Sequence, residues 1–288
     1  MFCGIEFQHV VPFKTQLLKW IGNKQRFAHE IASYFPTDVK TYFEPFLGSG
    51  AVLATLQPSN AIGSDAFAPL IEIWKMLAAD PENVVQWYRT RYKEYFDFEK
   101  PEGYERIKAR YNANPNGADL LFLCRSCYGG VVRFRKSDGY MSTPCGVHTP
   151  ITPGSFAQRV RIWRRRTAGA TFEKMDFSEA MQSAKRGDLV YCDPPYTHSQ
   201  AILYQGQGFE LARLMNDIAS CKERGVRVAL SIDGKKKSGQ VNCHLDIPDE
   251  LFEREVFVNC GRSMLRRFQR EGESLEDEVV HDRLLLTY

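Results

Sequence analysis

Asp193-Pro194-Pro195-Tyr196 is the segment whose residue types point most directly to chemistry. It follows an apolar, strand-like run at 188–192, so we expect it at the carboxyl end of a strand. There a carboxylate and a proline carbonyl could accept hydrogen bonds from an amino group, while a tyrosine ring stacks on a flat base. The pattern predicts chemistry on an exocyclic amine. A simple tight turn is the alternative, since Pro fixes φ and Asp favours turns.

A glycine-containing segment, Phe46-Leu47-Gly48-Ser49-Gly50, follows the first expected strand and opens a helix. Glycines there let the backbone turn tightly beside a ligand. Asp65 closes the next expected strand, where a carboxylate can bind both hydroxyls of a ribose. Leu53 replaces the third glycine of the dinucleotide fingerprint, which favours a nucleoside cofactor over NAD. An ordinary strand-to-helix turn with a capping Asp fits the same residues.

Two further segments could contribute to a cofactor site. The segment from Lys19 to Lys24 reads Lys-Trp-Ile-Gly-Asn-Lys, and its ammonium and amide donors could hold a carboxylate beside the apolar wall of Trp20. Asp176 and Phe177 follow another expected strand and could bind the amino group and the face of an adenine. Each segment alone is more often structural, and it is their order along the chain that favours a site.

Strand-like and helix-like patterns alternate over most of the chain. The expected strands span 40–46, 60–64, 170–173, 188–192 and 226–231, and the expected helices span 23–35, 49–56, 67–79, 177–184 and 209–223. This alternation predicts an α/β fold with a Rossmann-like, mostly parallel sheet and ligands at the carboxyl ends of its strands. Strand-like runs at 253–258 and 279–287 predict a C-terminal antiparallel hairpin on the edge of the sheet.

The alternation stops between about 81 and 166, where helical patterns lead into a loop rich in Gly, Pro, Ser and Thr. Thirteen Lys and Arg stand against four acids between Lys100 and Arg166, although the net charge of the whole chain is only +3. The asymmetry predicts an inserted domain at 81–166 that contacts a polyanion, and a catalytic domain formed by 1–80 and 167–288. A basic surface that only meets solvent is the alternative.

The bulk composition excludes other classes of protein. The hydrophobic share of 43% is ordinary for a folded protein, and no run of about 18 apolar residues predicts a membrane span. The start of the chain lacks the pattern of a signal peptide, so we expect a cytoplasmic protein with reduced thiols. Cys124 and Cys127 form a lone C-x-x-C without further ligands at zinc spacing, and no metal is predicted.

Together the motifs resemble the Dam-type DNA adenine-N6 methyltransferases, the alpha group in which the cofactor motifs precede the target-recognition domain and D-P-P-Y follows it. The resemblance runs from Lys19 to Tyr288. Its motifs are K-W-x-G-x-K at 19–24, E-P-F-x-G-x-G at 44–50, Asp65, Asp176, Y-C-D-P-P-Y at 191–196, Tyr204 and Gly208-Phe209. It implies a class I methyltransferase sheet, S-adenosylmethionine as cofactor, and methyl transfer to N6 of a flipped-out adenine in double-stranded DNA. A cognate restriction endonuclease is a further partner that it allows.

The resemblance also implies roles for residues. Asp193 and the carbonyl of Pro194 would hold the adenine amine, Pro195 belongs to the same motif, and Tyr196 would stack on the base. The predicted cofactor-binding residues are Trp20, Gly22, Lys24, Phe46, Gly48, Gly50, Asp65, Asp176, Phe177 and Asp193.

The segment from Arg133 to Gly146 resembles the recognition hairpin of the family. Arg135 stands where the family usually has Asn, and 140–144 departs from the usual Phe-Asn-Val-Pro. Because both departures lie in the recognition hairpin, they concern the DNA sequence that is recognised and not the reaction. Arg side chains can read guanine edges and bind phosphates, although a solvated helix face also fits the run 164–166. The predicted DNA-binding residues are Arg133, Arg135, Lys136, Tyr140, Arg164, Arg165, Arg166, Lys235, Lys236 and Lys237.

Other functions remain open on the sequence. Transfer to cytosine N4 uses a similar arrangement, although Ser more often replaces Asp193 there. A catalytically silent DNA-binding protein could use the same scaffold, and RNA or a protein amide is a less favoured substrate. Pro144-Cys145 matches the Pro-Cys dipeptide of cytosine-C5 methyltransferases, but that Cys belongs after the fourth strand, where Asp193 stands. We therefore assign Cys145 to the recognition loop.

Overall fold

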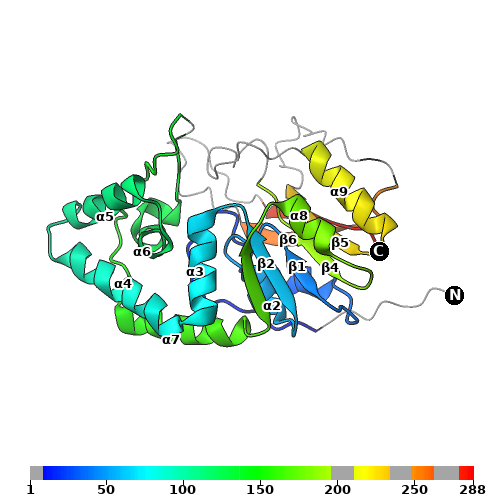
Figure 1. Cartoon of the computed structure of the whole chain (residues 1–288), viewed down its shortest axis with the longest axis horizontal. Coiled ribbons are helices and arrows are strands. Elements are labelled where there is room, and N and C mark those ends of the chain that lie inside the picture. The colour runs from blue at the N-terminus through cyan, green and yellow to red at the C-terminus, as the bar shows by residue number, and fades with distance from the viewer. Residues whose placement is uncertain (1–8, 136, 196–210, 234–247, 249, 263–278) are drawn as a thin grey trace.

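The structure, a computed structural model, describes residues 9–135, 137–195, 211–233, 248, 250–262 and 279–288 (Figure 1). It contains a seven-stranded sheet in the order β3-β2-β1-β4-β5-β7-β6. The parallel strands are β1 (Tyr42–Glu44), β2 (Ala61–Asp65), β3 (Ala170–Lys174), β4 (Leu189–Cys192) and β5 (Arg227–Asp233). β7 (Val279–Leu286) runs antiparallel to both β5 and β6 (Arg254–Arg262). The predicted Rossmann-like α/β fold with a C-terminal antiparallel pair is confirmed.

Successive side chains of a strand point to opposite faces of the sheet, and each face has its own buried cluster. Leu189 and Tyr191 of β4 join a cluster with residues of α1 (Ala28–Ser33), α2 (Ala51–Leu56) and α3 (Ala68–Ala79). Val190 and Cys192 join a second cluster with residues of α8 (Phe177–Ser183) and α9 (Leu211–Glu223). Helices therefore cover both faces, as the apolar strand patterns predict.

Helices also make up most of the segment 81–166, which lies beside α3 at the left of the sheet in Figure 1. They are α4 (Pro81–Phe96), α5 (Glu102–Ala113), α6 (Gly117–Ser126), the short 3₁₀ helix η1 (Tyr128–Gly130) and α7 (Pro153–Arg166). Asp80 caps α4 by accepting the N–H of Asn83 (3.1 Å). Tyr88 of α4 stacks on Phe156 of α7, with ring centroids 4.1 Å apart.

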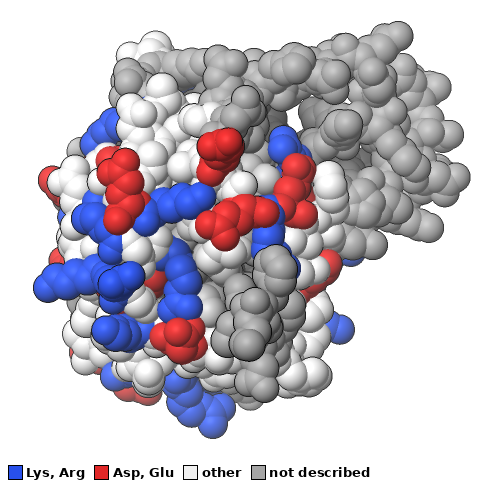
Figure 2. All heavy atoms as spheres, turned by 90° about the vertical axis from the view of Figure 1, so that its right-hand side faces the viewer, with Lys and Arg blue, Asp and Glu red and all other residues white. Residues whose placement is uncertain are grey.

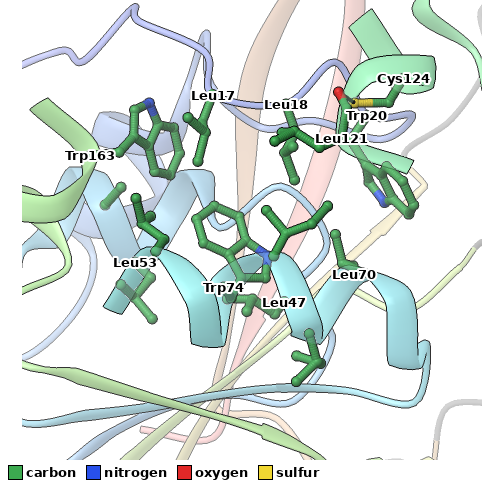
Figure 3. Packing of buried hydrophobic residues seen from close by; sticks show 14 of the residues in the cluster. Leu17, Leu18, Trp20, Leu47, Leu53, Leu70, Trp74, Leu121, Cys124 and Trp163 are labelled. Atoms are coloured by element: carbon green, nitrogen blue, oxygen red, sulfur yellow. Dashed lines mark hydrogen bonds between the residues drawn. The ribbon is translucent and has the colours of Figure 1, made fainter. Parts of the chain in front are cut away.

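Buried aromatic and leucine side chains connect these helices to the sheet (Figure 3). The ring of Trp163 on α7 lies 5.4 Å from that of Trp74 on α3, and Trp74 stacks on Phe172 of β3 at 5.6 Å. One buried cluster thus joins one face of the sheet to these helices. The division into domains at 80 and 167 therefore stays a prediction.

Candidate active site

The carboxyl ends of the parallel strands lie at one edge of the sheet, where ligands of such folds bind. Gly48 follows β1, Asp65 ends β2, and Asp193 follows β4. Because β1 pairs with both β2 and β4, these residues are neighbours at that edge. Asp193 and Pro195 are half-buried and Pro194 is buried, whereas Tyr196 lies outside the described residues.

The loop after β1 turns through two glycines in the left-handed region. Gly48 has a φ of +47° and Gly50 a φ of +61°, and Gly22 in the earlier segment has a φ of +73°. A Cβ atom on Gly48 would lie 3.3 Å from Cδ1 of Trp20, and one on Gly50 would lie 3.2 Å from the ring of Trp74. Trp74 Nε1 also donates a hydrogen bond to the carbonyl of Gly48 (3.2 Å). The glycines thus allow two tryptophans to pack against the loop and fix its shape.

Asp65 is bonded to the same loop. Its Oδ2 accepts the N–H of Gly48 (3.1 Å), and its Oδ1 accepts the N–H of Phe67 (3.0 Å). Burial raises the pKa of Asp65 to about 6, although the N–H donors of Phe67, Gly48 and Ala66 favour the ionised form. Each carboxylate oxygen has two lone pairs, so Asp65 can accept further hydrogen bonds from a ligand beside the loop.

The segment from Trp20 to Lys24 reaches the same edge. The Trp20 ring lies 6.2 Å from the ring of Phe67, which follows β2. Asn23 Oδ1 accepts the N–H of Gln25 (2.7 Å), while the buried Asn23 Nδ2 has no hydrogen-bond partner among the described residues. A buried amide donor of this kind fits an acceptor group on a ligand. Asn23 was not among the predicted site residues, although it lies inside the K-W-x-G-x-K motif.

Lys24 was predicted to bind the cofactor, and in the structure its ammonium group lies between two carboxylates. Nζ is 2.8 Å from Oδ1 of Asp193 and 3.5 Å from Oδ2 of Asp282 on β7. Burial acts to lower the pKa of Lys24, but the carboxylates of Asp193 and Asp282 outweigh it and raise the pKa above its usual value. The sequence reasoning missed Asp282, which no local motif marks.

Glu44, at the end of β1, is a second residue that the sequence reasoning missed. It is buried, and its Oε2 accepts hydrogen bonds from the Tyr42 hydroxyl (2.8 Å) and the Leu53 N–H (2.9 Å). Burial raises the pKa of Glu44 to about 8, and the charge of Asp193 acts in the same direction. Its position in E-P-F-x-G-x-G, directly at the end of a strand, was the available signal.

Phe46, Asp176 and Phe177, three of the predicted cofactor-binding residues, lie close to one another. The rings of Phe46 and Phe177 stack with centroids 5.2 Å apart. Asp176 caps α8 by accepting the N–H of Ser178 (3.0 Å), and its carboxylate also pairs with Arg213 of α9. The Arg213 guanidinium lies 4.7 Å from the centroid of the Phe177 ring. Arg213 is a neighbour of this group that the sequence pattern did not indicate.

The segment that resembles a recognition hairpin has a hairpin backbone. The N–H of Arg135 donates to the carbonyl of Tyr140 (2.9 Å), and Phe134 pairs with Met141 in an antiparallel bridge. Buried Phe134 packs edge-on against Phe67, with centroids 5.4 Å apart, so the hairpin lies beside the loop that follows β2. The predicted DNA-binding residues that are exposed here are Arg133, Arg135 and Tyr140.

The exposed side of the hairpin has its own contacts. Arg135 forms a salt bridge with Asp138 (2.8 Å), and its guanidinium lies 4.2 Å from the centroid of the Tyr140 ring. Tyr128, just before the hairpin, is 42% exposed, and its N–H donates to the carbonyl of Pro144 (2.9 Å). This exposed aromatic residue was missed, because the sequence does not distinguish it from the buried tyrosines of α4 and α5. Lys136 and the run 235–237 lie outside the described residues.

Arg164, Arg165 and Arg166 are not brought to this edge. They end α7, and Arg166 Nη1 donates to the carbonyl of Ala54 (3.0 Å). The next residues lead into the amino end of β3, where the carbonyl of Gly169 accepts the N–H of Ala61 (2.9 Å). The run therefore lies at the amino ends of β2 and β3, the edge opposite Asp193. The helix was predicted correctly, but its charge pattern could not indicate which edge of the sheet it would reach.

Charges are interspersed at the other end of the sheet. Figure 2, which views the molecule from the side of α9, shows Lys and Arg among Asp and Glu on the described surface. Ion pairs there include Arg227 with Asp38, Lys222 with Glu253 and Arg283 with Glu255. The described part of this surface therefore carries both signs of charge side by side.

The fold and the residues at the carboxyl edge place the chain among Rossmann-like proteins, whose ligands bind where the parallel strands end. Residues 20–255 match the family described as D12 class N6 adenine-specific DNA methyltransferase. Because the match covers most of the chain, the protein belongs to this family. The resemblance stated from the motifs is confirmed.

Individual relatives agree with the family. The DNA N-6-adenine-methyltransferase of Escherichia phage P1 is 26% identical over 287 residues, which are 94% of this chain and 35% of the phage protein. The retron Ec67 DNA adenine methylase of Escherichia coli is 31% identical over 190 residues, or 63% of this chain and 64% of the relative. A DNA adenine methylase of Vibrio cholerae is 28% identical over 229 residues, or 74% and 79%. The chain thus spans about a third of the phage relative and just under two thirds of the retron relative.

Two further classes of feature are missing from the described parts of the chain. None of the helices there is both long and apolar enough to span a membrane. No group of three or more His, Cys, Asp or Glu side chains within those parts is placed to hold a metal ion.

Proposed function

We propose that the protein transfers a methyl group from S-adenosylmethionine to the N6 amino group of adenine in double-stranded DNA. The observation that carries the proposal is the position of Asp193-Pro194-Pro195 after β4, one strand away from the glycine loop that follows β1. A carboxylate for the substrate amine and a loop for the cofactor then share one edge of the sheet. Membership of an adenine-specific family supports this assignment.

The residues at this edge fit S-adenosylmethionine. A Cβ atom on Gly48 would crowd Trp20, Asp65 has acceptor capacity for a ribose, and Asn23 has a buried donor without a described partner. The further residues that we propose to line the cofactor site are Trp20, Gly22, Phe46, Gly50, Asp176 and Phe177. When bound, the cofactor supplies a methyl group on a positively charged sulfur.

Asp193 and Pro194 would accept hydrogen bonds from the adenine amine and so make its nitrogen a better nucleophile. The lone pair of this amine is delocalised into the ring, so it must be localised before it can attack a methyl group. Asp193 can accept one N6 hydrogen and the carbonyl of Pro194 the other, which draws the nitrogen towards tetrahedral geometry. Acceptors fixed in advance where positive charge develops stabilise the transition state. We also propose that Asp193 takes the proton that N6 loses.

The adenine must leave the helix to reach these groups. Flipping a base costs a few kcal/mol, and stacking on an aromatic side chain returns roughly 1–3 kcal/mol. We propose that Tyr196 provides this stack.

The segment 81–166 is proposed to bind the DNA. The hairpin supports this, because Phe134 packs against Phe67 beside Asp65 while Arg133, Arg135 and Tyr140 remain exposed. Arg133 and Arg135 would read base edges, and the exposed Tyr128 would contact the duplex next to them. Lys136 and the run 235–237 stay proposed DNA-binding residues. The run 164–166 is left out of the proposed interface, because it lies at the opposite edge of the sheet.

Two wider expectations accompany the proposal. The substrate is DNA inside the cell, so we expect the enzyme to act in the cytoplasm. A cognate restriction endonuclease stays a prediction; the relatives include a type II methyltransferase of Lactococcus lactis, 25% identical over 227 residues.

The proposal can be tested with purified protein, labelled S-adenosylmethionine and duplex DNA of mixed sequence. Digestion of the product to nucleosides should give labelled N6-methyladenine. Labelled N4-methylcytosine would identify the rival base instead. S-Adenosylmethionine should also raise the unfolding temperature, because a ligand that binds only the folded state stabilises it. A silent DNA-binding protein would show neither labelling nor a shift.

A further inference from the structure

The C-terminal strand β7 contributes a carboxyl group to the candidate site. β7 runs antiparallel to β5, so its first residues lie at the edge where the parallel strands end. Asp282 pairs with Asp233, the last residue of β5, and with Val258 of β6. The Asp282 side chain is 10% exposed. Asp282 also lies outside the residues that match the family, 20–255, so that match assigns it no role.

Asp282 faces the same side of the sheet as the other carboxyl groups of the site. Leu284 and Leu286 of β7 belong to the buried cluster that contains Tyr42 and Tyr191. Side chains two residues apart on a strand share a face, so Asp282 continues the face of Leu284, just as Glu44 continues that of Tyr42. Carboxyl groups from β1, from the residue after β4 and from β7 therefore follow one another along one edge.

Lys24 lies among these carboxyl groups. Its buried ammonium is 2.8 Å from Asp193 and 3.5 Å from Asp282. Two carboxylates that share a buried site cannot both stay ionised easily, because each disfavours the charge of the other. A cation between them removes this penalty, and a buried pair that loses one partner is strongly destabilised.

The charged and titratable groups around Lys24 come from several strands at this edge. Among the described side chains they are Glu44 of β1, Tyr191 of β4, Asp193 after β4 and Asp282 of β7. Burial raises the pKa of Glu44 to about 8, so at neutral pH Glu44 is mainly protonated and adds little charge. The charge balance of the described groups at neutral pH then depends on Lys24, Asp193 and Asp282.

We propose that Asp282 is a positioning residue for the methyl transfer: it holds the Lys24 ammonium in place, and Lys24 in turn keeps the Asp193 carboxylate ionised and oriented towards the adenine amine. The inference rests on the proposed function, in which Asp193 accepts a hydrogen of the amine. Lys24 acts here through Asp193, and Asp282 acts through Lys24.

The test compares Lys24→Met, Asp282→Asn and the double variant Lys24→Met/Asp282→Asn, with kcat measured at saturating DNA and cofactor over a range of pH. Lys24→Met should lower kcat at neutral pH about 10- to 100-fold, since two unscreened carboxylates take up a proton, and activity should return as the pH is raised. The kcat of the double variant should be about tenfold higher than that of Lys24→Met, because removing the Asp282 carboxylate removes its repulsion of the Asp193 carboxylate.

Asp282→Asn alone should lower kcat about tenfold, because Lys24 is less firmly placed, with little change in the KM for DNA. The acidic limb of its pH profile should move to lower pH, opposite to the shift in Lys24→Met. Asp282→Glu, which keeps the charge, should retain more activity than Asp282→Asn. Arg283→Gln is the matched control, because its side chain pairs with Glu255 and lies outside the cluster; its kcat should equal that of the parent.

Two results would overturn the proposal. The double variant could be no more active than Lys24→Met, or the dependence of kcat on pH in Asp282→Asn could coincide with that of the parent. A third result would also overturn it: the Kd for the cofactor rises in Lys24→Met and stays equally high in the double variant. Lys24 would then bind the cofactor directly. Circular dichroism and unfolding temperatures separate these outcomes from loss of fold, and Asp282→Glu remains informative if the double variant is unstable. Failure of the proposed function would be visible separately, as absence of N6-methyladenine in the product of the parent protein.

Discussion

The edge of the sheet around Asp193 and the hairpin around Arg133 are neighbours, yet they are built in different ways. At the sheet edge, charged groups are buried and bonded to groups distant in sequence, as Lys24 is to Asp193 and Asp282. On the hairpin, charges are exposed and paired locally, as Arg135 is with Asp138. A change at the first region disturbs several partners, whereas a change at the second alters the contact surface alone. The comparison indicates that the reaction is strongly constrained by the fold and that the DNA sequence recognised is not.

The largest expected effect is at the buried edge. Asp193→Ala should reduce methyl transfer about 100- to 1,000-fold, because it removes an acceptor fixed for the developing charge. DNA affinity, measured by fluorescence anisotropy, should stay within a few-fold of the parent, since the proposed function gives Asp193 a contact to the flipped base and none to the duplex. Near-normal turnover would contradict the assigned role.

At the hairpin, Arg133→Ala should relax discrimination at one base pair by about 1–3 kcal/mol, the value of a bidentate contact to a base edge. The effect should appear in kcat/KM ratios for DNAs that differ at single positions, while kcat on the preferred DNA changes less. Arg133 is exposed, so the unfolding temperature should not change. Equal loss on all sequences would make Arg133 a phosphate contact.

Two glycines provide a test of the cofactor loop. Gly48→Ala forces a Cβ atom to within 3.3 Å of Trp20 at a φ of +47°, and should weaken S-adenosylmethionine binding about tenfold with a loss of roughly 1 kcal/mol in stability. Gly154→Ala is the control, because a Cβ atom there meets nothing within 4 Å. Calorimetric titration should show normal affinity for the control and reduced affinity for Gly48→Ala.

The pH dependence of cofactor binding tests Asp65. Its pKa is raised to about 6, so the carboxylate that would accept the ribose hydroxyls is ionised above that pH and protonated below it. Affinity for S-adenosylmethionine should therefore be constant near neutral pH and decrease as the pH falls through about 6. Asp65→Asn should bind more weakly and remove this dependence. A Kd of the parent that is independent of pH in this range would count against the ribose contact.

The smallest effect is expected from the basic run on α7. Arg165→Ala should leave DNA affinity and its salt dependence unchanged, because Arg165 lies at the amino ends of the strands. A lost phosphate contact would reduce the slope of log K against log salt concentration by about one. Such a reduction would restore the run 164–166 to the interface.

Much of the fold was predictable from local patterns. Each strand from β1 to β5 overlaps a predicted apolar run, and the antiparallel β6 and β7 overlap the last two. The neighbourhood of Gly48, Asp65 and Asp193 followed from the rule that parallel strands end at one edge. These features depend on residues close in sequence and on a general property of the sheet.

Other features depend on tertiary placement and could not be predicted. The pairing of Lys24 with Asp282 requires the direction and register of β7 relative to β5. The pKa of Glu44 depends on burial that no motif records. The run 164–166 shows the same limit, since its charge pattern predicted a helix but not which edge of the sheet that helix would reach.

The central claim is that Asp193 enables methyl transfer to adenine N6. The most direct measurement is to express the parent chain and Asp193→Ala in a host that lacks adenine methylation, and to map modified bases across the genome by single-molecule sequencing. The account predicts N6-methyladenine within one recurring sequence for the parent and none for Asp193→Ala. Modified cytosine in the parent, or equal adenine methylation in both, would contradict it.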